Sequence, residues 1–235
     1  MKKHRLIGLL LILMVVASGC ATESGPTEDT PEEFVRFYDP WEPMNRNIYR
    51  FNANFDKYVF LPVIRGYRFV TPQVVRTGLS NFFDNIGEAN VIVNSILQLS
   101  PTKTVKSIAR FTINSTVGIA GFFDVAQHWK LPGENEDFGQ TLGFYGVGPG
   151  PFLVVPILGP SSFRDASGLL IDRAMITVPL MIWVPAASPY TTGAGFLEAI
   201  QTRDDLTFRY GELGPFEYNL IRGLYLEFRK IQIAN

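Results

Sequence analysis

The stretch that decides the fold runs from Asp39 to Val59 and reads DPWEPMNRNIYRFNANFDKYV. Aspartate is a common helix cap, Pro40 suits the first helical position, and Glu42 stands three residues after Asp39, the capping-box spacing. Pro43 is tolerated because the amides of a first helical turn have no intrahelical acceptor. We therefore expect a helix to begin here, with Asp39 as its cap.

Hydrophobic residues follow in this stretch at every third or fourth position, the period of an amphipathic helix. Asparagines and arginines occupy most of the positions between them. The stripe consists of Trp41, Met44, Ile48, Phe51, Phe55 and Tyr58 or Val59.

Similar helix-start signals, a capping residue followed by proline or by a capping-box pattern, recur farther along the chain and predict further helices. Alternating strand patterns are scarce, and no Asn-Gly type dipeptide separates two such runs. The sequence therefore predicts an all-α fold. The expected helical segments open at Thr71-Pro72, at Glu88 (to Leu99), at Ser100-Pro101, at Asp137-Phe138-Gly139-Gln140, at Ser162-Phe163-Arg164-Asp165 (toward Pro179) and near Phe216 (to Ile231).

The first 19 residues are typical of a secretion signal. Lys2, Lys3 and Arg5 precede an apolar run from Leu6 to Val16, which is too short for a bilayer span of about 20 residues. Small residues then lead to Cys20, the single cysteine of the chain. This arrangement resembles a bacterial lipobox, in which the thiol is acylated and becomes the mature N-terminus. Two or three acyl chains anchor a protein stably where one is marginal.

Residues 20–33 are expected to be an acidic tether between the lipidated cysteine and the folded body. Five of the chain's 22 acidic residues lie there, together with Gly25, Pro26 and Pro31, and no large apolar residue. Such a composition cannot bury a core. We expect residues 34–235 to form a single helical domain that is nearly neutral.

The composition excludes several classes of function. Of 235 residues, 46% are hydrophobic and 18% are charged, against about 25% charged in typical soluble domains. Near-neutral charge argues against nucleic-acid binding, and one cysteine excludes a cysteine-rich zinc site. Only His128 would remain after signal cleavage, without a Gly-x-Ser-x-Gly elbow. We expect no catalytic residue, no metal site and no cofactor.

A glycine- and proline-rich segment from Gly143 to Pro160 interrupts the helical pattern. Pro149 and Pro151 lack the amide protons that a phosphate-binding loop needs. A stiff apolar loop or hairpin remains, which either packs over the core or faces lipid or a partner. The candidate residues of this segment are Gly143, Gly146, Gly148, Gly150, Phe152, Leu153, Val154, Val155, Pro156, Ile157 and Leu158.

Leu169 to Val184 is a second unusual segment, apolar apart from Asp172, Arg173 and Thr177. Its proline at 179 and its length argue against a membrane span. We favour a buried core helix over partial insertion into one leaflet with Trp183 at the interface.

Several motifs resemble the MlaA (VacJ) family of outer-membrane lipoproteins. They occur in the family's order from Tyr38 to about Asp172, and the last sixty or so residues carry weaker markers. The motifs are Tyr38–Arg46 with Phe51-Asn52, Asn81–Asn85, Asn94–Gln98, Arg110-Phe111, Asn114–Gly118, Gly121–Ala126, Glu136–Gly143 and Pro156–Asp165.

The resemblance implies a ring of short, partly amphipathic helices in the inner leaflet of the Gram-negative outer membrane, around a central amphipathic channel. Family members remove phospholipids misplaced in the outer leaflet, which preserves lipid asymmetry. They pass them to the periplasmic carrier MlaC, for the inner-membrane transporter MlaFEDB, and associate with a trimeric porin. No covalent chemistry on the lipid is implied. Within this picture, the candidate residues of the Gly143–Pro160 segment line or gate the channel. Asn81, Phe82 and Phe83 are either ring-stabilising residues or ordinary core residues.

Two other functions remain open. The chain could be a structural lipoprotein that tethers porins or envelope layers, in which case it would not co-purify with phospholipid. A phospholipase is the third possibility, and it would depend on His128.

Overall fold

The computed structural model describes residues 39–183 and 188–234, and the chain divides into two units, 1–33 and 34–235. All described elements belong to the second unit. The α-helices are α2 (Glu42–Phe55), α3 (Leu61–Val70), α4 (Gln73–Leu97), α5 (Pro101–Thr116), α6 (Val125–His128), α7 (Phe138–Phe144), α8 (Phe163–Trp183), α9 (Ser188–Asp205) and α10 (Glu217–Ala234).

The strands within the described ranges form one small hairpin. Strand β1 (Phe152–Val155) pairs antiparallel with β2 (Gly159–Ser162), with Phe152 opposite Ser162 and Val155 opposite Gly159. Since helices make up the rest of the regular structure described, the predicted all-α class is confirmed.

Helices α2 and α3 are joined by a π-helical segment, Asp56–Phe60, into one continuous helical rod from Glu42 to Val70. The amide of Leu61 donates to the carbonyl of Asp56, five residues earlier. The next residue, Pro62, has no amide to donate. A local π turn before such a residue lets the helix continue past it.

The capping role predicted for Asp39 is wrong. Helix α2 is preceded by Trp41, which makes no side-chain cap. The Asp39 carboxylate instead accepts hydrogen bonds from Asn45 Nδ2 at 2.8 Å, from the Tyr218 hydroxyl at 2.5 Å and from Arg222 at 3.1 Å. Tyr218 and Arg222 belong to α10, and these tertiary donors satisfy the carboxylate better than one helix amide would.

Helix α4 corrects another expectation, because it is one helix of 25 residues where the sequence predicted two segments. The residues between the two segments include Gly87 but no proline. An interior glycine costs only about 1 kcal/mol relative to alanine, so it does not end a well-packed helix. Helix α5 begins at Pro101, as predicted.

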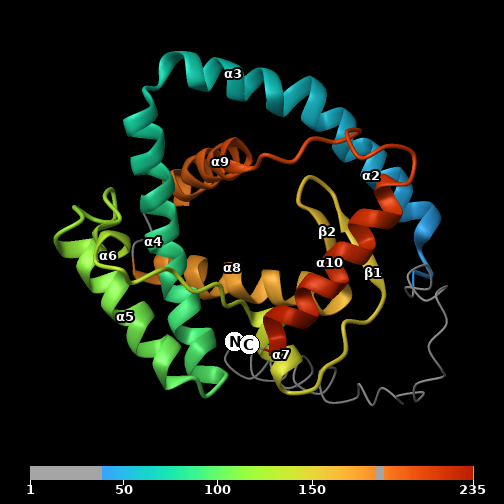
Figure 1. The fold of residues 1–235 in the computed structure, drawn as a ribbon. Coiled ribbons are helices and arrows are strands. Elements are labelled where there is room, and N and C mark those ends of the chain that lie inside the picture. The colour runs from blue at the N-terminus through green and yellow to red at the C-terminus, as the bar shows by residue number, and fades with distance from the viewer. Residues whose placement is uncertain (1–38, 184–187, 235) are drawn as a thin grey trace, which may run out of the picture. The chain divides into compact units, whose positions relative to one another are not determined.

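The elements of this unit follow one another around a ring (Figure 1). The rod of α2 and α3 forms one side, and Thr71 and Pro72 turn the chain into α4. Helix α8 leads from α4 to the hairpin, which packs against α2 and closes the ring. Helix α5 lies along α4, and α9 contacts α3 and α4.

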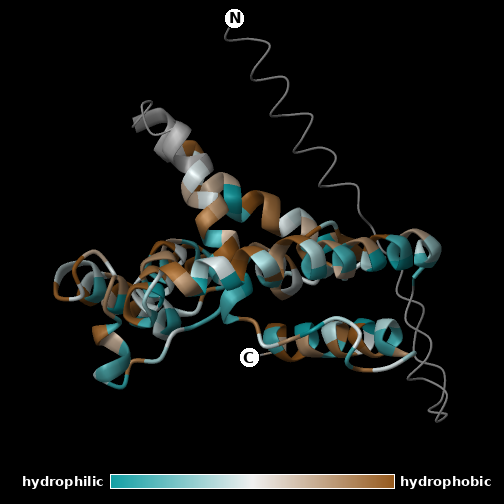
Figure 2. Ribbon diagram, turned by 90° about the horizontal axis from the view of Figure 1, so that it is seen from above, coloured by the Kyte–Doolittle hydropathy of each residue, from teal (hydrophilic) through white to brown (hydrophobic). Residues whose placement is uncertain are grey.

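Burial in this unit is inverted relative to an ordinary soluble domain. Among the described residues, more than twice as many polar or charged residues as hydrophobic residues are buried. Large hydrophobic side chains are exposed on nearly every helix, including Phe69 at 91% and Phe228 at 57%, and Phe216, just before α10, is 75% exposed. Figure 2 shows hydrophobic and hydrophilic residues mixed along the same helices. In a soluble protein, hydrophobic residues fill the core and extended apolar patches are rare.

The predicted helical stripes follow this inversion. On α2, Met44 and Phe51 are exposed while Asn45 and Asn52 are buried. On α10, Leu220, Leu224, Phe228 and Ile231 are exposed, while Ile221 packs against the hydrophobic cluster.

Helix α8 begins as predicted, since the Ser162 hydroxyl accepts a hydrogen bond from the Asp165 amide at 3.1 Å. It continues through position 179 to Trp183. The favoured core interpretation is wrong for Leu170 and Val178, which are 73% and 50% exposed, while the charged residue Asp172 is buried. No helix in the described ranges has both the length and the hydropathy that crossing a bilayer requires.

Candidate functional site

The β1–β2 hairpin is held to α2 by two asparagine side chains. Asn45 donates from Nδ2 to the Phe152 carbonyl at 2.9 Å and accepts from the Val154 amide at 2.9 Å. Asn52 donates to the Val155 carbonyl at 3.0 Å and accepts from the Ile157 amide at 2.7 Å. Each carboxamide therefore pairs with the strand backbone as a neighbouring peptide group would.

These asparagines are functional candidates that the sequence patterns did not single out. They lie seven residues apart, which is two helical turns and places them on one face of α2. Both are buried. Asparagine is a poor residue for a helix interior, so two of them on one face were a readable sign of partners outside the helix.

The hairpin divides into a buried strand and an exposed tip. Phe152 and Val154 point into the core, where they pack with Tyr49 and Tyr218. Leu158, at the tip, is 63% exposed. The hairpin predicted as one alternative for this segment is therefore present, with one face of β1 in the core and an apolar tip outside it.

Backbone strain is concentrated at the tip. Ile157 has a φ of 70°, a conformation that β-branched residues rarely adopt. The hydrogen bond from its amide to Asn52 Oδ1 holds it there. Gly159 follows with a φ of 93°, where glycine pays no steric penalty.

The expectation of one continuous loop from Gly143 is wrong at its start. Gly143 lies in α7, and a side chain there would meet Ile233 of α10 and Arg164 of α8. The glycine allows close helix packing rather than loop flexibility. Gly146, Gly148 and Gly150 lie in the irregular connection between α7 and β1.

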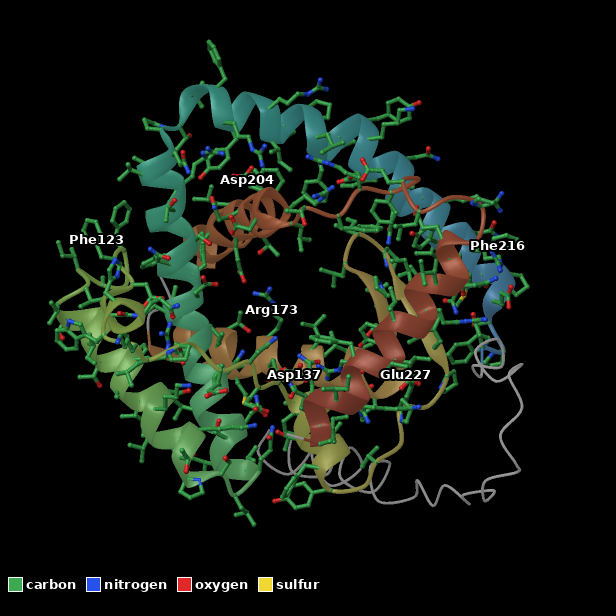
Figure 3. All side chains as sticks on the ribbon, viewed as in Figure 1. Phe123, Asp137, Arg173, Asp204, Phe216 and Glu227 are labelled. Carbon is green, nitrogen blue, oxygen red and sulfur yellow. The ribbon has the colours of Figure 1, made fainter. Side chains whose placement is uncertain are left out.

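A buried charge cluster joins α7, α8 and α10 beneath the hairpin. Arg229 of α10 bonds to both oxygens of Asp137, at 2.6 and 2.8 Å, and to both oxygens of Asp165, at 3.0 and 3.1 Å. Arg164 and Tyr225 also donate to Asp165, at 2.9 and 2.8 Å. Figure 3 shows Asp137 close to α10.

The same cluster sets the ionisation of its carboxyl groups. Burial by itself raises the pKa of Asp165, but the hydrogen bonds from Arg229, Arg164 and Tyr225 outweigh it and lower that pKa to about 2. Burial also raises the pKa of Asp137, but the hydrogen bonds and charge of Arg229 outweigh it. The pKa of Asp137 therefore lies below its ordinary value. Asp137 also accepts the Gln140 amide at 2.9 Å, which confirms the predicted cap of α7.

Asn81, Phe82 and Phe83 lie near the middle of α4. Asn81 donates to the Phe122 carbonyl at 3.2 Å, and the Phe82 and Phe83 rings meet edge to face at 5.5 Å. Asn81 lines a cavity of about 280 Å³ with Gly78 and the Phe122–Phe123 turn. The role of these residues as ring supports remains a prediction.

A larger cavity, of about 420 Å³, lies between α4 and α9. Phe83 and Leu206 supply its apolar lining, and three carboxylates lie among the polar residues. Burial, then the charge of Asp205, raises the pKa of Asp84. The lining residues are Ser80, Phe83, Asp84, Glu198, Gln201, Thr202, Asp205 and Leu206.

The other sequence predictions concern catalysis, metals and lipidation. Within the described ranges, no three His, Cys, Asp or Glu side chains are grouped to hold a metal. His128 is exposed, and its ring nitrogen Nδ1 lies 2.8 Å from the Asp124 carbonyl oxygen. Cys20 and the predicted signal and tether, residues 1–33, lie outside the described residues.

Comparisons with known proteins agree with this architecture. The family model described as MlaA lipoprotein matches residues 37–232. The chain is 39% identical over 203 residues to "Intermembrane phospholipid transport system lipoprotein MlaA" of Escherichia coli strain K12, which covers 84% of this chain and 78% of that protein. It is 40% identical over 165 residues to an uncharacterized protein of Rickettsia prowazekii, covering 67% of this chain and 65% of that protein.

The chain spans 59–65% of the length of four rickettsial relatives. A solved structure described as "Structural basis for maintenance of bacterial outer membrane lipid asymmetry" shares the fold. Its TM-score is 0.70 and its identity 33%, and the match covers 85% of this chain and all of that one. With matches of this extent to both sequence and structure, the chain belongs to the MlaA lipoprotein family.

Proposed function

We propose that this protein moves phospholipids out of the outer leaflet of the Gram-negative outer membrane and so maintains lipid asymmetry. The observation that carries the proposal is the inverted burial of the ring, in which polar side chains are buried and large hydrophobic side chains are exposed. Exposed apolar surface of this extent is stable only against lipid or a partner. An acyl anchor at Cys20 would hold the ring at the inner leaflet, on the periplasmic side.

A phospholipid needs a path that is polar for its head group and apolar for its tails. The hairpin contributes an apolar surface to such a path, because Ile157 and Leu158 at its tip are exposed, while the buried side chains of Asn45 and Asn52 pin β1 and the tip to α2. We infer that the hairpin lines or gates a channel through the ring. Transport through this chain is passive, without covalent change to the lipid.

The partners follow from the same proposal. A lipid that reaches the periplasmic side needs a soluble carrier, for which we propose MlaC. We propose a trimeric porin as the neighbour in the membrane, since it would cover part of the apolar exterior. A purely structural tether would fit the exterior equally well but needs no hairpin gate.

The first experiment is deletion of the gene, followed by an assay of phospholipids exposed in the outer leaflet. The proposal expects exposed phospholipid to rise and to fall again when the intact gene is restored. An unchanged leaflet would overturn it. Phospholipid that co-purifies with the protein would argue against the structural tether, and release of fatty acids that is lost in His128→Ala would favour the phospholipase.

The second experiment tests the gate by placing charges on the hairpin. Leu153→Glu and Leu158→Glu should fail to restore asymmetry while the protein still folds and reaches the outer membrane. Leu158 is the cleaner site because its side chain is 63% exposed. Thr102→Glu, at an exposed polar position in the first turn of α5, is the control for an added negative charge and should restore asymmetry. Normal leaflet composition with both hairpin variants would contradict gating but not transport.

A further inference from the structure

Arg173 of α8 is the most exposed of the ion-paired arginines among the described residues. Its side chain is 56% exposed, against 46% for Arg68 and 39% for Arg46, and those of Arg110, Arg222 and Arg229 are 10% exposed or less. Those three each bridge two acidic residues inside the protein. Arg173 pairs with Glu198 of α9 alone.

Arg173 also lies next to the area that the ring surrounds and to the cavity between α4 and α9. In Figure 3 its side chain extends from α8 into the area that the ring surrounds. Glu198, its partner, lines the 420 Å³ cavity between α4 and α9. The guanidinium therefore lies at the edge of that cavity and on the inner side of the ring.

The hydrogen bonds of Arg173 to the described residues involve Nη1 and its backbone carbonyl, not Nη2 or Nε. Nη1 donates to both oxygens of Glu198, at 2.9 Å each. Nη2 and Nε donate to no described residue. An arginine has five N–H donors in a planar fork, which suits two oxygens of a phosphate group. Glu198 thus fixes the guanidinium in place while part of the fork stays open.

Stability does not explain this pair. An exposed ion pair contributes about 0–1 kcal/mol, because water screens it and ordering two long side chains costs entropy. Buried pairs such as Arg229 with Asp165 already join the helices of this unit. A half-exposed cation on the inner side of the ring is better explained by a ligand that carries negative charge.

We propose that Arg173 is a specificity-determining residue that binds the phosphodiester of a phospholipid head group on its way through the ring. The inference rests on the proposed transport function and adds the residue that recognises the lipid. The carboxylates of Asp84 and Asp205 would repel an anion from inside the cavity, so the phosphodiester contacts the α8 side of Glu198. Glu198 acts as a positioning residue and competes with the phosphodiester for Nη1.

The test uses the full-chain lipoprotein purified in nonionic detergent. Its probes are short-chain phosphatidylethanolamine, short-chain phosphatidylglycerol, a diacylglycerol of equal chain length and inorganic phosphate. Wild-type protein should bind both phospholipids more tightly than the diacylglycerol and more tightly than inorganic phosphate. Inorganic phosphate that binds as tightly as the lipids would overturn the assignment of a lipid ligand.

The decisive comparison is between the two partners of the pair. Arg173→Gln should weaken binding of both phospholipids at least tenfold and leave diacylglycerol binding unchanged, while Arg173→Lys restores part of the loss. Glu198→Gln should leave phospholipid binding unchanged or tighter, because it removes the competing carboxylate. A merely structural pair predicts equal losses for Arg173→Gln and Glu198→Gln.

The control is Lys230→Gln, which removes the cation of another exposed ion pair, Glu227 with Lys230 at 2.8 Å. It should bind all probes as wild type does. Equal losses in the two partner variants, or wild-type binding by Arg173→Gln, would overturn the inference. If deletion of the gene still raises outer-leaflet phospholipid, the proposed function survives that result; an unchanged leaflet removes both.

Discussion

At the scale of single residues, the amide side chains of Asn45 and Asn52 explain how a two-stranded hairpin persists among helices. An isolated hairpin is marginally stable in water. Each asparagine offers one donor and one acceptor to the free edge of β1, so α2 takes the place of a third strand. Aspartate could not do so, because an ionised carboxylate has no donor.

Removal of one of these side chains should loosen the hairpin. Asn52→Ala leaves the Ile157 amide and the Val155 carbonyl without their partner, which costs about 1–3 kcal/mol. Hydrogen exchange of the amides in 152–162 should accelerate accordingly. Asn47→Ala, at an exposed position of α2, is the control and should leave the exchange as it is. Equal protection in the two variants would refute the role given to Asn52.

The inverted polarity also begins at the residue scale. Glu42 was expected to complete a capping box, but it binds Arg46 at 2.7 Å. Asp39 was expected to cap, but it binds Asn45, Tyr218 and Arg222. Local patterns could identify Asp39 and Glu42 as polar residues that need partners. Only folding could decide that two partners of Asp39, Tyr218 and Arg222, lie more than 170 residues away in the chain.

At the scale of elements, the junction of α7, α8 and α10 depends on Asp165. Asp165→Asn leaves the buried Arg229 and Arg164 with less negative charge around them. Breaking a buried ion pair on one side costs about 3–5 kcal/mol. Denaturant titration in detergent at pH 7 should give a loss of this size. A loss below 1 kcal/mol would mean that the helices are joined by packing instead.

The pH dependence of this junction has a definite sign. The folded-state pKa of Asp165 is about 2, below its ordinary value of 3.8. A lowered carboxyl pKa contributes stability that is complete above the ordinary value and is lost as the pH falls through the folded value. The difference in unfolding free energy between wild type and Asp165→Asn should therefore shrink between pH 4 and pH 2. A difference that stays constant over this range would contradict the ionised cluster.

Helix α4 offers a matched pair of glycines. A side chain at Gly78 would place Cβ 2.1 Å from the Phe122 ring, whereas nothing lies within 4 Å of one at Gly87. Gly87→Ala should stabilise the protein by about 0.5–1 kcal/mol, because alanine favours the helix. Gly78→Ala should destabilise it, since Phe122 must move. Thermal unfolding of the two variants side by side measures both signs, and stabilisation by Gly78→Ala would refute the close packing.

At the scale of the whole molecule, the exposed hydrophobic surface is the property that a membrane would use. Phe69 is 91% exposed. Burial of one phenylalanine in lipid contributes about 1.5–3 kcal/mol. With lipidation removed by Cys20→Ser, Phe69→Ser should therefore reduce binding to phospholipid vesicles about tenfold or more in a flotation assay.

The same substitution should leave folding intact. Phe69→Ser is expected to change the unfolding free energy in detergent by no more than about 0.5 kcal/mol, as surface substitutions usually do. Glu227→Ser, at another exposed position, is the control for vesicle binding and should have no effect on it. Undiminished vesicle binding by Phe69→Ser would mean that this part of α3 does not face lipid.

Much of the helical framework could be predicted from local chemistry. Prolines mark where α2 and α5 begin, and Asp137 and Ser162 cap α7 and α8 as expected. Helix α9 was not predicted, because Ser188–Asp205 carries no clear apolar period and two glycines. The hairpin was only an alternative, since its turn carries Ile157 at positive φ in place of an Asn-Gly pair.

Local sequence is enough to locate where most helices begin and to assign the all-α class and the family motifs, because caps, prolines and short motifs act through neighbours in the chain. The acyl anchor at Cys20 stays a prediction from the same kind of local pattern. Tertiary structure alone decided which side of each helix is buried. Helical period identifies an apolar face but not what that face meets, and here polar side chains on distant helices satisfy one another in the buried contacts between helices. The partners of Arg229, the clamp of Asn45 and Asn52, and the open donors of Arg173 are all consequences of that choice, since each depends on contacts between residues far apart in the chain.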